Sequence, residues 1–458
     1  MQKICIQGLG FVGSAMATAV AIAEDNRGKL IYDVVGVDLP NETGKKRVDA
    51  INKGEFPFTI SDDRLLLALT KAHKNGNLRA STDQNEYIQA DIIVVDVHLD
   101  IPYLDDEPQL LFTEFIEAIQ AIGKKISSET LIIIETTVPP GTCEKIVIPT
   151  LRIELEKRHI DPHSVHVAHS YERVMPGEKY LESIIDYWRV FAGYTKKAGD
   201  LCEEFLKNVV NIDKFPLTRL SSTIASETAK VMENTYRATN IAFIDEWTKY
   251  AETVGIDMFE VIDAIKVRPT HSNIMFPGLG VGGYCLTKDP TFTPAASKQL
   301  FKKALDFPFS KMAVKINHEM PLHTIKRLIS FLGPLKGMRI LVCGISYRED
   351  VGDSRFSPSE TLVRELTKNK ANVFCHDPYL TYWDELDLAL LKELPKPANY
   401  NAVIMAVAHK QYRELILSNW ALGTELVLDA SSIFNKEQRN LAREQGIRVE
   451  SIGRGEGL

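Results

Sequence analysis

Short apolar runs of β type alternate with amphipathic stretches over the first 212 residues, and this alternation is the strongest constraint on the fold. The apolar runs are KICIQG, LIYDVVGVD, DIIVVDV, LIIIETT and VHVAHS. Strand-like runs separated by helix-forming stretches predict a parallel sheet with crossover helices. We therefore expect a doubly wound, Rossmann-like domain over residues 1–212.

The rest of the chain divides into a helical part and a second, smaller sheet. From Ser221 to about Met320, apolar residues recur at helical spacing with no strand-like run between them. The alternation resumes in MRILVCGIS, ANVFCHDP, NAVIMAVAH and ELVLDASS. We expect an α/β protein in which a central helical domain, residues 213–320, joins two Rossmann-like parallel-sheet domains, the second over residues 321–458. The long apolar helix of the central domain is typical either of a dimer interface or of a buried core helix between domains.

Composition and charge narrow the class of partner. The chain has 458 residues, 45% hydrophobic and 25% charged, as an ordinary globular protein does. Its formal net charge of −7 gives no general attraction for nucleic acid, and no basic block with interleaved aromatic residues provides a local one. We read no signal peptide and no apolar run of the roughly 18 residues that a membrane span needs. We expect a cytoplasmic protein with no membrane or nucleic-acid partner.

A glycine-rich turn follows the first strand-like run and precedes a helical pattern; its sequence is Gly8-Leu9-Gly10-Phe11-Val12-Gly13. In this context the pattern predicts a dinucleotide site, in which Gly8 allows the tight turn, Gly10 lets a pyrophosphate approach and Gly13 lets helix and strand pack. Asp38 ends the second run, where an acid binds the adenosine ribose and would repel a 2′-phosphate, so NAD is favoured over NADP. The alternative is a glycine turn in a sheet that binds nothing.

The six cysteines are expected to be reduced thiols rather than a disulfide framework. Cys5, Cys343 and Cys375 lie in strand-like runs, which predicts buried and inert side chains. Only Cys285 lies in a glycine-rich, non-periodic segment flanked by charged residues, Gly-Val-Gly-Gly-Tyr-Cys-Leu-Thr-Lys-Asp. The sequence therefore distinguishes Cys285 from the other thiols.

Three nearby histidines, His163, His166 and His169, raise the question of a metal site. On a strand, residues three apart point to opposite faces. We therefore expect no metal ion.

Several motifs together resemble the UDP-glucose/GDP-mannose 6-dehydrogenases, in the order of that family and over nearly the whole chain. They are GLGFVG; Arg47-Val48 with Asn52-Lys53-Gly54-Glu55 and Pro57; ETTVPPGT at 135–142; SETAK and ENTYR within 226–237; Phe276-Pro277-Gly278 through Gly283-Tyr284-Cys285; and SYR at 346–348 with DSRFSP at 353–358. These enzymes oxidise a sugar C6 alcohol to a carboxylate with two NAD and one water. The resemblance implies NAD on the N-terminal domain, a nucleotide sugar bound mainly by the other two, and a homodimer or higher homo-oligomer.

The resemblance assigns the chemical steps to particular side chains. Lys230 and Asn234 are one helical turn apart, so they share a face, and the family uses this pair to hold the reacting oxygen; by spacing alone a solvated face is the alternative. Cys285 would trap the aldehyde as a thiohemiacetal, which is oxidised to a thioester that water hydrolyses. Glu172 would activate this water, and Asp289 would support the water network around the oxygen.

Binding positions follow from the same resemblance. Thr137 would touch both nicotinamide and water, and Arg47, Lys288 and Arg355 would contact NAD. From its position alone, Lys288 could instead lower the pKa of the Cys285 thiol. The positions expected to contact the nucleotide sugar are Glu172, Arg173, Val174, Lys230, Asn234, Arg268, Phe276, Gly278, Gly280, Gly282, Gly283 and Arg348.

Three of these binding assignments have alternatives. Arg348 stands where the family usually has a lysine, and a partly buried ion pair is the alternative for both Arg348 and Arg355. His271 competes with Arg268 as the basic residue that the family can contribute across a dimer. The glycines before Cys285 are expected to leave room for the sugar.

The chain departs from the family pattern at Asp96 to Asp100, where Pro-Thr-Pro is common, and at Tyr171, where proline is usual. The run from Glu172 to Gly177 resembles members that act on UDP-N-acetylhexosamines, of the UDP-ManNAc or UDP-GlcNAc type, with UDP-glucose as the alternative substrate. Two other functions remain open. One is a β-hydroxyacid dehydrogenase, which performs a single oxidation, and the other is a non-catalytic protein that binds NAD or a nucleotide sugar.

Overall fold

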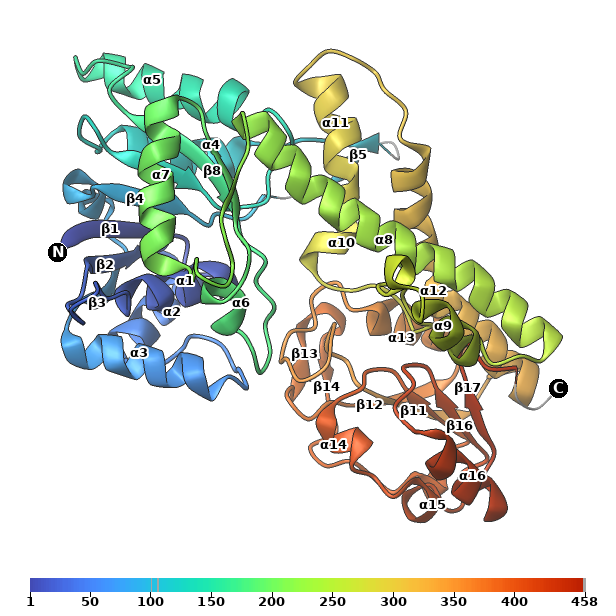
Figure 1. Cartoon of the computed structure of the whole chain (residues 1–458). Helices are drawn as coiled ribbons and strands as arrows, with labels where there is room; N and C mark the ends of the chain where they lie inside the picture. The colour runs from blue at the N-terminus through green and yellow to red at the C-terminus, as the bar shows by residue number, and fades with distance from the viewer. Residues whose placement is uncertain (100, 105–106, 456–458) are drawn as a thin grey trace. The chain divides into compact units, whose positions relative to one another are not determined.

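The computed structural model describes residues 1–99, 101–104 and 107–455, and its contacts divide the chain into two compact units. We call residues 1–233 and 291–306 the N-terminal unit, and residues 234–290 and 307–458 the C-terminal unit. The boundary falls within the longest helix, α8 (Thr223–Val254), which contributes residues to both units (Figure 1). The three expected domains, with boundaries after residues 212 and 320, remain a prediction.

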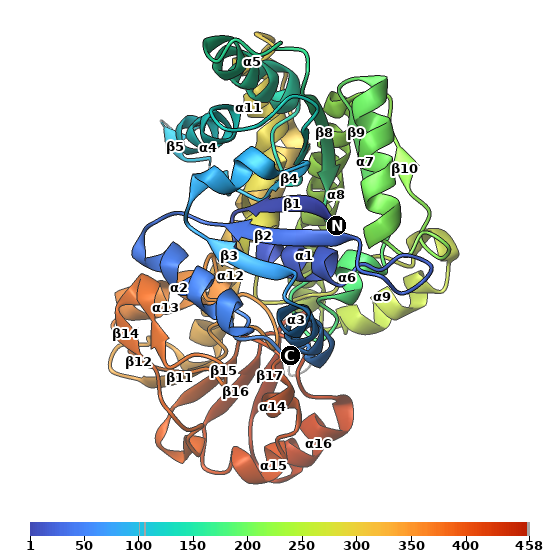
Figure 2. The same ribbon diagram turned by 90° about the vertical axis from the view of Figure 1, so that its left-hand side faces the viewer.

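An eight-stranded sheet forms the centre of the N-terminal unit, in the order β10-β9-β8-β7-β4-β1-β2-β3 (Figure 2). Its strands are β1 (Gln2–Gln7), β2 (Tyr32–Val37), β3 (Leu78–Ser81), β4 (Ile92–Val95), β7 (Leu131–Ile134), β8 (His166–Tyr171), β9 (Val190–Gly193) and β10 (Thr218–Arg219). All neighbouring pairs are parallel except β8 with β9. The chain adds β2 and β3 on one side of β1 and β4 onward on the other, so the carboxyl ends of β1 and β4 form the switch point where such sheets bind ligands.

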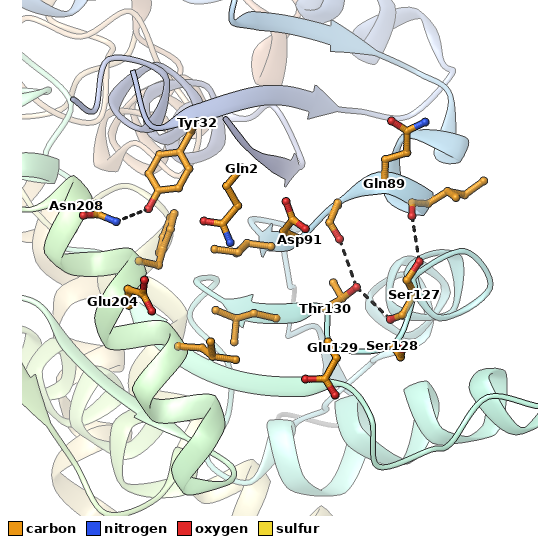
Figure 3. Close-up of a pocket in the computed structure, with 16 residues that line it drawn as sticks. Gln2, Tyr32, Gln89, Asp91, Ser127, Ser128, Glu129, Thr130, Glu204 and Asn208 are labelled. Atoms are coloured by element: carbon orange, nitrogen blue, oxygen red, sulfur yellow. Dashed lines mark hydrogen bonds between the residues drawn. The ribbon is translucent and has the colours of Figure 1, made fainter. Parts of the chain in front are cut away.

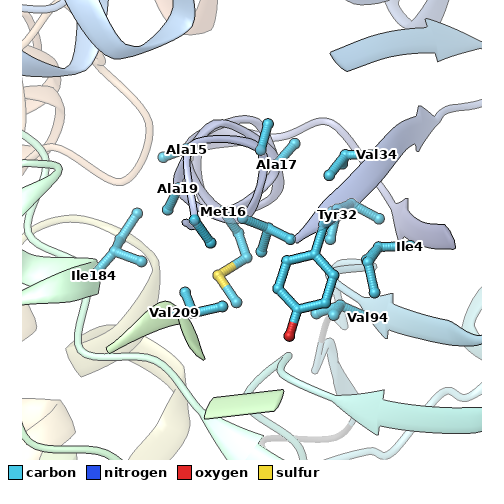
Figure 4. Close-up of a cluster of buried hydrophobic side chains, with 14 of the residues drawn as sticks. Ile4, Ala15, Met16, Ala17, Ala19, Tyr32, Val34, Val94, Ile184 and Val209 are labelled. Atoms are coloured by element: carbon cyan, nitrogen blue, oxygen red, sulfur yellow. The ribbon is translucent and has the colours of Figure 1, made fainter. Parts of the chain in front are cut away.

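Helices cover both faces of this sheet. They are α1 (Phe11–Ala21), α2 (Glu42–Lys53), α3 (Asp63–Asn75), α4 (Thr113–Gly123), α5 (Ile148–Lys157), α6 (Glu182–Ile185), α7 (Lys196–Val209) and α11 (Phe292–Gln299); a hairpin pairs β5 (Tyr103–Leu104) with β6 (Glu107–Pro108). Alternate residues of β1 serve opposite layers, since Ile4 and Ile6 pack in one apolar cluster and Cys5 in another. Figure 4 shows the first cluster, in which Met16 of α1 extends toward Val209 of α7.

The C-terminal unit combines helices with a smaller sheet, as the sequence predicts. From Thr223 to Leu332 the described elements are helical, and the strands that follow form a parallel sheet in the order β12-β11-β15-β16-β17. The helices are α9 (Met258–Lys266), α10 (Tyr284–Lys288), α12 (Pro308–Leu332), α13 (Pro358–Lys368), α14 (Lys410–Arg413), α15 (Leu417–Trp420) and α16 (Lys436–Glu444). The strands are β11 (Arg339–Cys343), β12 (Asn372–His376), β15 (Ala402–Met405), β16 (Leu426–Asp429) and β17 (Val449–Ser451), beside the hairpin of β13 (Tyr382–Trp383) and β14 (Leu388–Ala389). No helix within the described ranges is long and apolar enough to cross a bilayer.

A pocket with polar walls opens at the amino ends of β1, β2, β4 and β7 (Figure 3). Asp91 and Glu129 line it, and Asn208 donates a 2.9 Å hydrogen bond to the Tyr32 hydroxyl at one wall. Ligands of doubly wound sheets bind at the carboxyl ends of the strands. This pocket is therefore distinct from the switch point where the cofactor is expected.

Candidate active site

The glycine-rich turn joins β1 to α1 at the switch point and has the geometry that a dinucleotide requires. Gly8 has a φ of +93°, and a Cβ on Gly13 would lie 1.8 Å from the Gly8 carbonyl oxygen. Both positions therefore require glycine. At Gly10 no atom lies within 4 Å of an added Cβ, and no side chain caps the start of α1. An approaching pyrophosphate fits this helix N-terminus, which begins with Phe11 and Val12.

Asp38 follows β2 and faces the same turn. Its carboxylate accepts hydrogen bonds from the backbone N–H groups of Leu9, at 3.1 Å, and Leu39, at 2.7 Å. The Arg47 guanidinium lies 3.3 Å from Asp38 Oδ2 and stacks 5.6 Å above the ring of Phe58. The glycine turn thus orients the acid that the sequence assigns to the ribose, and Arg47 of α2 restrains the same carboxylate.

The segment after β7 carries Thr137 and is held at two points. Thr136 Oγ1 donates to the carbonyl oxygens of Val95, at 3.0 Å, and Val97, at 2.8 Å. Glu227 of α8 accepts from the backbone N–H groups of Gly141, at 2.6 Å, and Cys143, at 2.8 Å. Burial raises the pKa of Glu227 to about 7. Sequence reasoning gave no role to Glu227, although an acid on a helix face of small residues was a usable signal.

Lys230 and Glu172 form a nearly buried charge pair. The Lys230 ammonium donates to the Glu172 carbonyl oxygen at 2.7 Å and lies 3.6 Å from its carboxylate Oε1. The carboxylate also accepts from the backbone N–H of Val174. These contacts bring together three of the residues expected at the site.

Tyr171, one of the departures from the family pattern, lies beneath two cations. Its ring is 5.4 Å from Lys230 Nζ and 5.3 Å from the Arg173 guanidinium. Arg173 is ion-paired with Glu233 at 2.8 Å and donates to the Trp188 carbonyl oxygen at 2.7 Å. Tyr171 therefore organises the surroundings of Lys230, and Arg173 is already engaged with protein groups.

Cys285 differs from the other five cysteines in exposure. All six lie in the described part of the chain, none forms a disulfide, and Cys285 is exposed whereas the others are buried. Burial raises the pKa of the Cys5 and Cys375 thiols to about 12. The prediction that Cys5, Cys343 and Cys375 are buried is confirmed.

Buried polar contacts hold the helix that carries Cys285. Asp289 is fully buried at the end of α10, where it accepts from Asn234 Nδ2 at 2.7 Å and from Lys288 Nζ at 3.1 Å. Lys288 Nζ also lies 5.7 Å from the centre of the Tyr284 ring. The structure thus brings Asn234, Asp289 and Lys288 into contact within this unit. Lys288 and Asp289 follow Cys285 closely in the sequence.

The glycines before Cys285 accommodate protein rather than empty space. A Cβ on Gly280 would lie 2.7 Å from Pro358 Cβ, and one on Gly282 would lie 2.8 Å from Pro358 Cδ. A Cβ on Gly283, whose φ is +76°, would lie 2.7 Å from the Tyr347 ring. These three glycines let the Cys285 loop pack against residues 347–358, so the expectation that they leave room for a sugar is corrected. Only at Gly278, among these four, does an added Cβ meet no atom within 4 Å.

The expected basic residues lie in different surroundings. The Arg355 guanidinium donates two hydrogen bonds to Asp353, at 2.9 and 2.7 Å, and lies 5.4 Å from the Tyr284 ring. Arg348 is half-buried in the loop after β11. Arg268 and His271 are both exposed, so exposure does not separate them, and neighbouring Phe276 stacks on Phe259.

The stretch from Asp96 to Asp100 is described only up to Leu99, so Asp100 lies outside the described residues. Among the described residues, no group of three His, Cys, Asp or Glu side chains could hold a metal ion. His169 Nδ1 instead lies 2.8 Å from Ser226 Oγ.

Comparison with known proteins gives a family match along the chain. Sequence profiles of the UDP-glucose/GDP-mannose dehydrogenase family match as the NAD binding domain at residues 2–210, the central domain at 224–319 and the UDP binding domain at 341–436. The UDP-N-acetyl-D-mannosamine dehydrogenase of Methanocaldococcus jannaschii is 30% identical over 460 residues, which cover 99% of this chain and 97% of that protein. The NDP-N-acetyl-D-galactosaminuronic acid dehydrogenase of Ralstonia nicotianae is 26% identical, with 95% and 97% covered. The solved structure of the UDP-D-ManNAc dehydrogenase from Pyrococcus horikoshii has a TM-score of 0.81 at 25% identity, with 99% of this chain and 100% of that one covered.

Proposed function

The chain belongs to the UDP-glucose/GDP-mannose dehydrogenase family, and on that premise we propose that it oxidises the C6 alcohol of a UDP-N-acetylhexosamine to the uronate through a covalent intermediate on Cys285. The exposure of Cys285, among five buried thiols, is the observation that carries the proposal. NAD, the cofactor of the family's N-terminal domain, would when bound supply the hydride acceptor for each of the two oxidations. The proposed cofactor contacts are Gly8, Gly10, Phe11, Val12, Gly13, Asp38, Arg47, Thr137, Lys288 and Arg355.

Residues of the N-terminal unit are proposed to stabilise the charge on the reacting oxygen and to activate the water. The Lys230 ammonium is nearly buried, so its charge acts strongly on the C6 oxygen, which becomes negative as its proton passes to water before the hydride leaves. Glu172 takes a proton from the water that attacks the thioester, and Thr137 orients that water. The contact of Lys230 with the Glu172 backbone supports a shared role.

Residues of the C-terminal unit are assigned to the covalent steps. The Cys285 sulfur adds to the aldehyde carbon, and the aldehyde oxygen becomes the hydroxyl of a thiohemiacetal. After the second oxidation, water oxygen bonds to the carbonyl carbon, the carbon–sulfur bond breaks and the thiolate is restored. Asn234 and Asp289 hold the reacting oxygen and its water, and their mutual hydrogen bond fixes both side chains.

The proposed substrate is of the UDP-N-acetylmannosamine type. Two observations support it: the match to a UDP binding domain at residues 341–436, and relatives whose names specify N-acetylated aminosugars. The proposed contacts, besides Glu172, Lys230 and Asn234, are Arg173, Val174, Arg268, Phe276, Gly278 and Arg348. We propose a division into domains 1–212, 213–320 and 321–458, which the three matched segments support.

One assay tests the proposal. The protein is incubated with NAD and a panel of UDP-sugars, and NADH is counted per sugar consumed; we expect two with a UDP-N-acetylhexosamine. One NADH would indicate a simple alcohol dehydrogenase, and none with any sugar would favour a binding protein. With Cys285→Ser the reaction should stop before the carboxylate is formed. Cys375→Ala, which replaces a buried thiol, should still yield two NADH per sugar. Full turnover by Cys285→Ser would contradict the thioester.

We also propose a homodimer formed through α8. Its exposed large apolar side chains are spaced by three, four or seven residues, which suits helix pairing, and they are Met232, Tyr236, Phe243, Trp247, Tyr250 and Val254. A charge in the middle of such a seam is costly to bury. Trp247→Glu should therefore give a monomer by light scattering, and an unchanged mass would contradict this interface. The cytoplasmic location also remains a proposal, supported by six cysteines without a disulfide.

A further inference from the structure

Two acidic residues stand side by side at the carboxyl ends of β4 and β7. These parallel strands are in register at Val95 and Ile134, so Asp96 and Glu135 follow as neighbours. Asp96 Oδ2 and Glu135 Oε2 are buried, and neither receives a hydrogen bond from a donor in the described residues. The two carboxyl groups are within hydrogen-bonding reach of each other. Because two ionised carboxylates have only acceptors, this contact requires a proton on one of them.

The charges around the pair favour one shared proton. Arg189, which precedes β9, donates to Glu135 Oε1 at 2.6 Å, and both side chains are 2% exposed. The other titratable groups that face the pair are Glu172 after β8 and Cys202 on α7. With one proton, the two carboxyl groups and Arg189 are neutral together, whereas full ionisation would leave a buried negative charge. Burial, and then the neighbouring carboxylate, raise the pKa of Asp96.

This pair lies directly against the glycine-rich turn. An added Cβ on Gly8 would be 2.7 Å from the Asp96 carbonyl oxygen, and one on Gly13 would be 3.3 Å from Asp96 Cβ. Arg189 Nη2 lies 3.7 Å from the sulfur of Met16 on α1, the helix that begins at this turn. Asp96 Oδ2 and Glu135 Oε2 are themselves buried, and Glu135 lies two residues before Thr137, the proposed nicotinamide contact, so the charge of the nicotinamide ring acts on the pair with reduced screening.

We propose that Asp96 and Glu135 share one proton whose occupancy follows the charge of the bound nicotinamide, so that the pair increasingly favours NAD⁺ over NADH as the pH rises. NAD⁺ carries one positive charge more than NADH, on the nicotinamide ring. That charge stabilises the fully ionised pair, so the NAD⁺ complex loses the shared proton at a lower pH than the NADH complex. This inference rests on the proposed cofactor site at residues 8–13.

The pair has a use in the proposed reaction. Two oxidations of one sugar require that NADH leave and NAD⁺ bind between them. A carboxyl pair that binds its proton more tightly in the NADH complex makes this exchange more favourable as the pH rises. Asp96, which stands where the family pattern differs, is thus a positioning residue for cofactor exchange rather than a group that touches the sugar.

The dissociation constants of NAD⁺ and NADH, measured by calorimetry from about pH 6 to about pH 9, test the proposal. In the wild type, the ratio of the NADH to the NAD⁺ constant should rise with pH, by up to about ten-fold per pH unit where one proton is exchanged. In Asp96→Asn the amide N–H replaces the shared proton, so the ratio should be flat. Asp91→Asn, which changes an exposed acid at the opposite end of β4, should follow the wild type.

The outcomes separate this inference from the cofactor site. A flat ratio in the wild type, with both nucleotides bound, would overturn the shared proton and leave the cofactor site intact; loss of binding to both would overturn the two together. Infrared difference spectra of the wild type provide a second readout that needs no variant. The carbonyl band of a protonated carboxyl should be stronger in the NADH complex than in the NAD⁺ complex, and equal bands would overturn the proposal.

Discussion

The turn after β1 and the turn after β11 begin alike and end differently. Each follows an interior strand that is parallel to both of its neighbours, and each starts with a glycine in the left-handed region, Gly8 with φ +93° and Gly344 with φ +101°. After β1, helix α1 begins at once, with open space at Gly10 and no side-chain cap. After β11, residues 345–357 intervene, and the Ser357 side chain caps α13 by accepting from the Ser359 N–H.

The longer turn is held by one buried carboxylate. Asp377 accepts from the backbone N–H groups of Ile345, at 2.8 Å, and Ser346, at 2.9 Å, and from His409 Nε2 at 3.2 Å. The first sheet thus leaves a helix N-terminus available to a phosphate, while the second satisfies its own N-terminus and extends a loop that carries Arg348. Similar strand patterns therefore serve two different kinds of ligand contact.

Gly13→Val should have the largest effect. Its Cβ would lie 1.8 Å from the Gly8 carbonyl oxygen, so β1 and α1 must separate. We expect the free energy of unfolding of the N-terminal unit to fall by about 3 kcal/mol or more, as for other overpacked sites. Denaturant titration followed by circular dichroism measures this change. If Gly13→Val were as stable as the wild type, β1 and α1 would not pack as closely as described.

Asp377→Asn should act on the other turn. It removes the negative charge to which five groups hydrogen-bond. We expect the free energy of unfolding to fall by about 2–3 kcal/mol and UDP-sugar binding to weaken, while NAD affinity stays unchanged. Hydrogen bonds from His409 and the backbone lower the pKa of Asp377 below its ordinary 3.8 despite burial. The carboxylate therefore contributes stability above pH 3.8 that is lost as the pH falls through its lowered pKa. The difference between wild type and variant, from denaturant titrations at several pH values, should shrink in acid; a constant difference would contradict the charge argument.

The sequence predicts the first turn better than the second. Gly8, Gly10, Gly13 and Asp38 follow one another within a single strand–helix–strand unit, so local spacing carries their geometry. Asp377 lies 32 residues beyond Ile345, on the neighbouring strand's end, and only the register of β11 with β12 brings them together.

The same difference explains what was missed at the candidate site. Sequence patterns identify Cys285 as a candidate, and likewise the pair of Lys230 and Asn234, because a glycine-rich segment and a helical spacing are local features. They do not show that Glu227 holds the Thr137 segment, or that Asp96 faces Glu135, because those contacts join separate elements. They also misread Gly280, Gly282 and Gly283, whose packing partners lie about 70 residues away.

Gly10→Ala should separate binding from folding. An added Cβ meets no protein atom within 4 Å, and the φ of Gly10 is −68°, so stability should be close to wild type. The methyl group would occupy the approach of the pyrophosphate, and we expect NAD affinity to fall about ten-fold, equivalent to about 1.4 kcal/mol. Calorimetric titration with NAD measures this loss. Unchanged affinity would mean that the pyrophosphate does not bind at Gly10. The two turns would then differ in structure but not in phosphate binding.

Ser357→Ala should have the smallest effect, and it tests whether the second helix really depends on its own cap. The side chain accepts from the Ser359 N–H at 3.2 Å and donates to the Ser346 carbonyl oxygen at 3.3 Å, so it joins α13 to the loop that carries Arg348. Loss of a serine cap costs about 1 kcal/mol, and Ser357→Asn should restore most of it because asparagine caps as well as serine. Denaturant titration of both variants measures the loss and its rescue. If Ser357→Ala unfolds as the wild type does, this cap does not stabilise α13, and the difference between the two turns lies in the intervening loop alone.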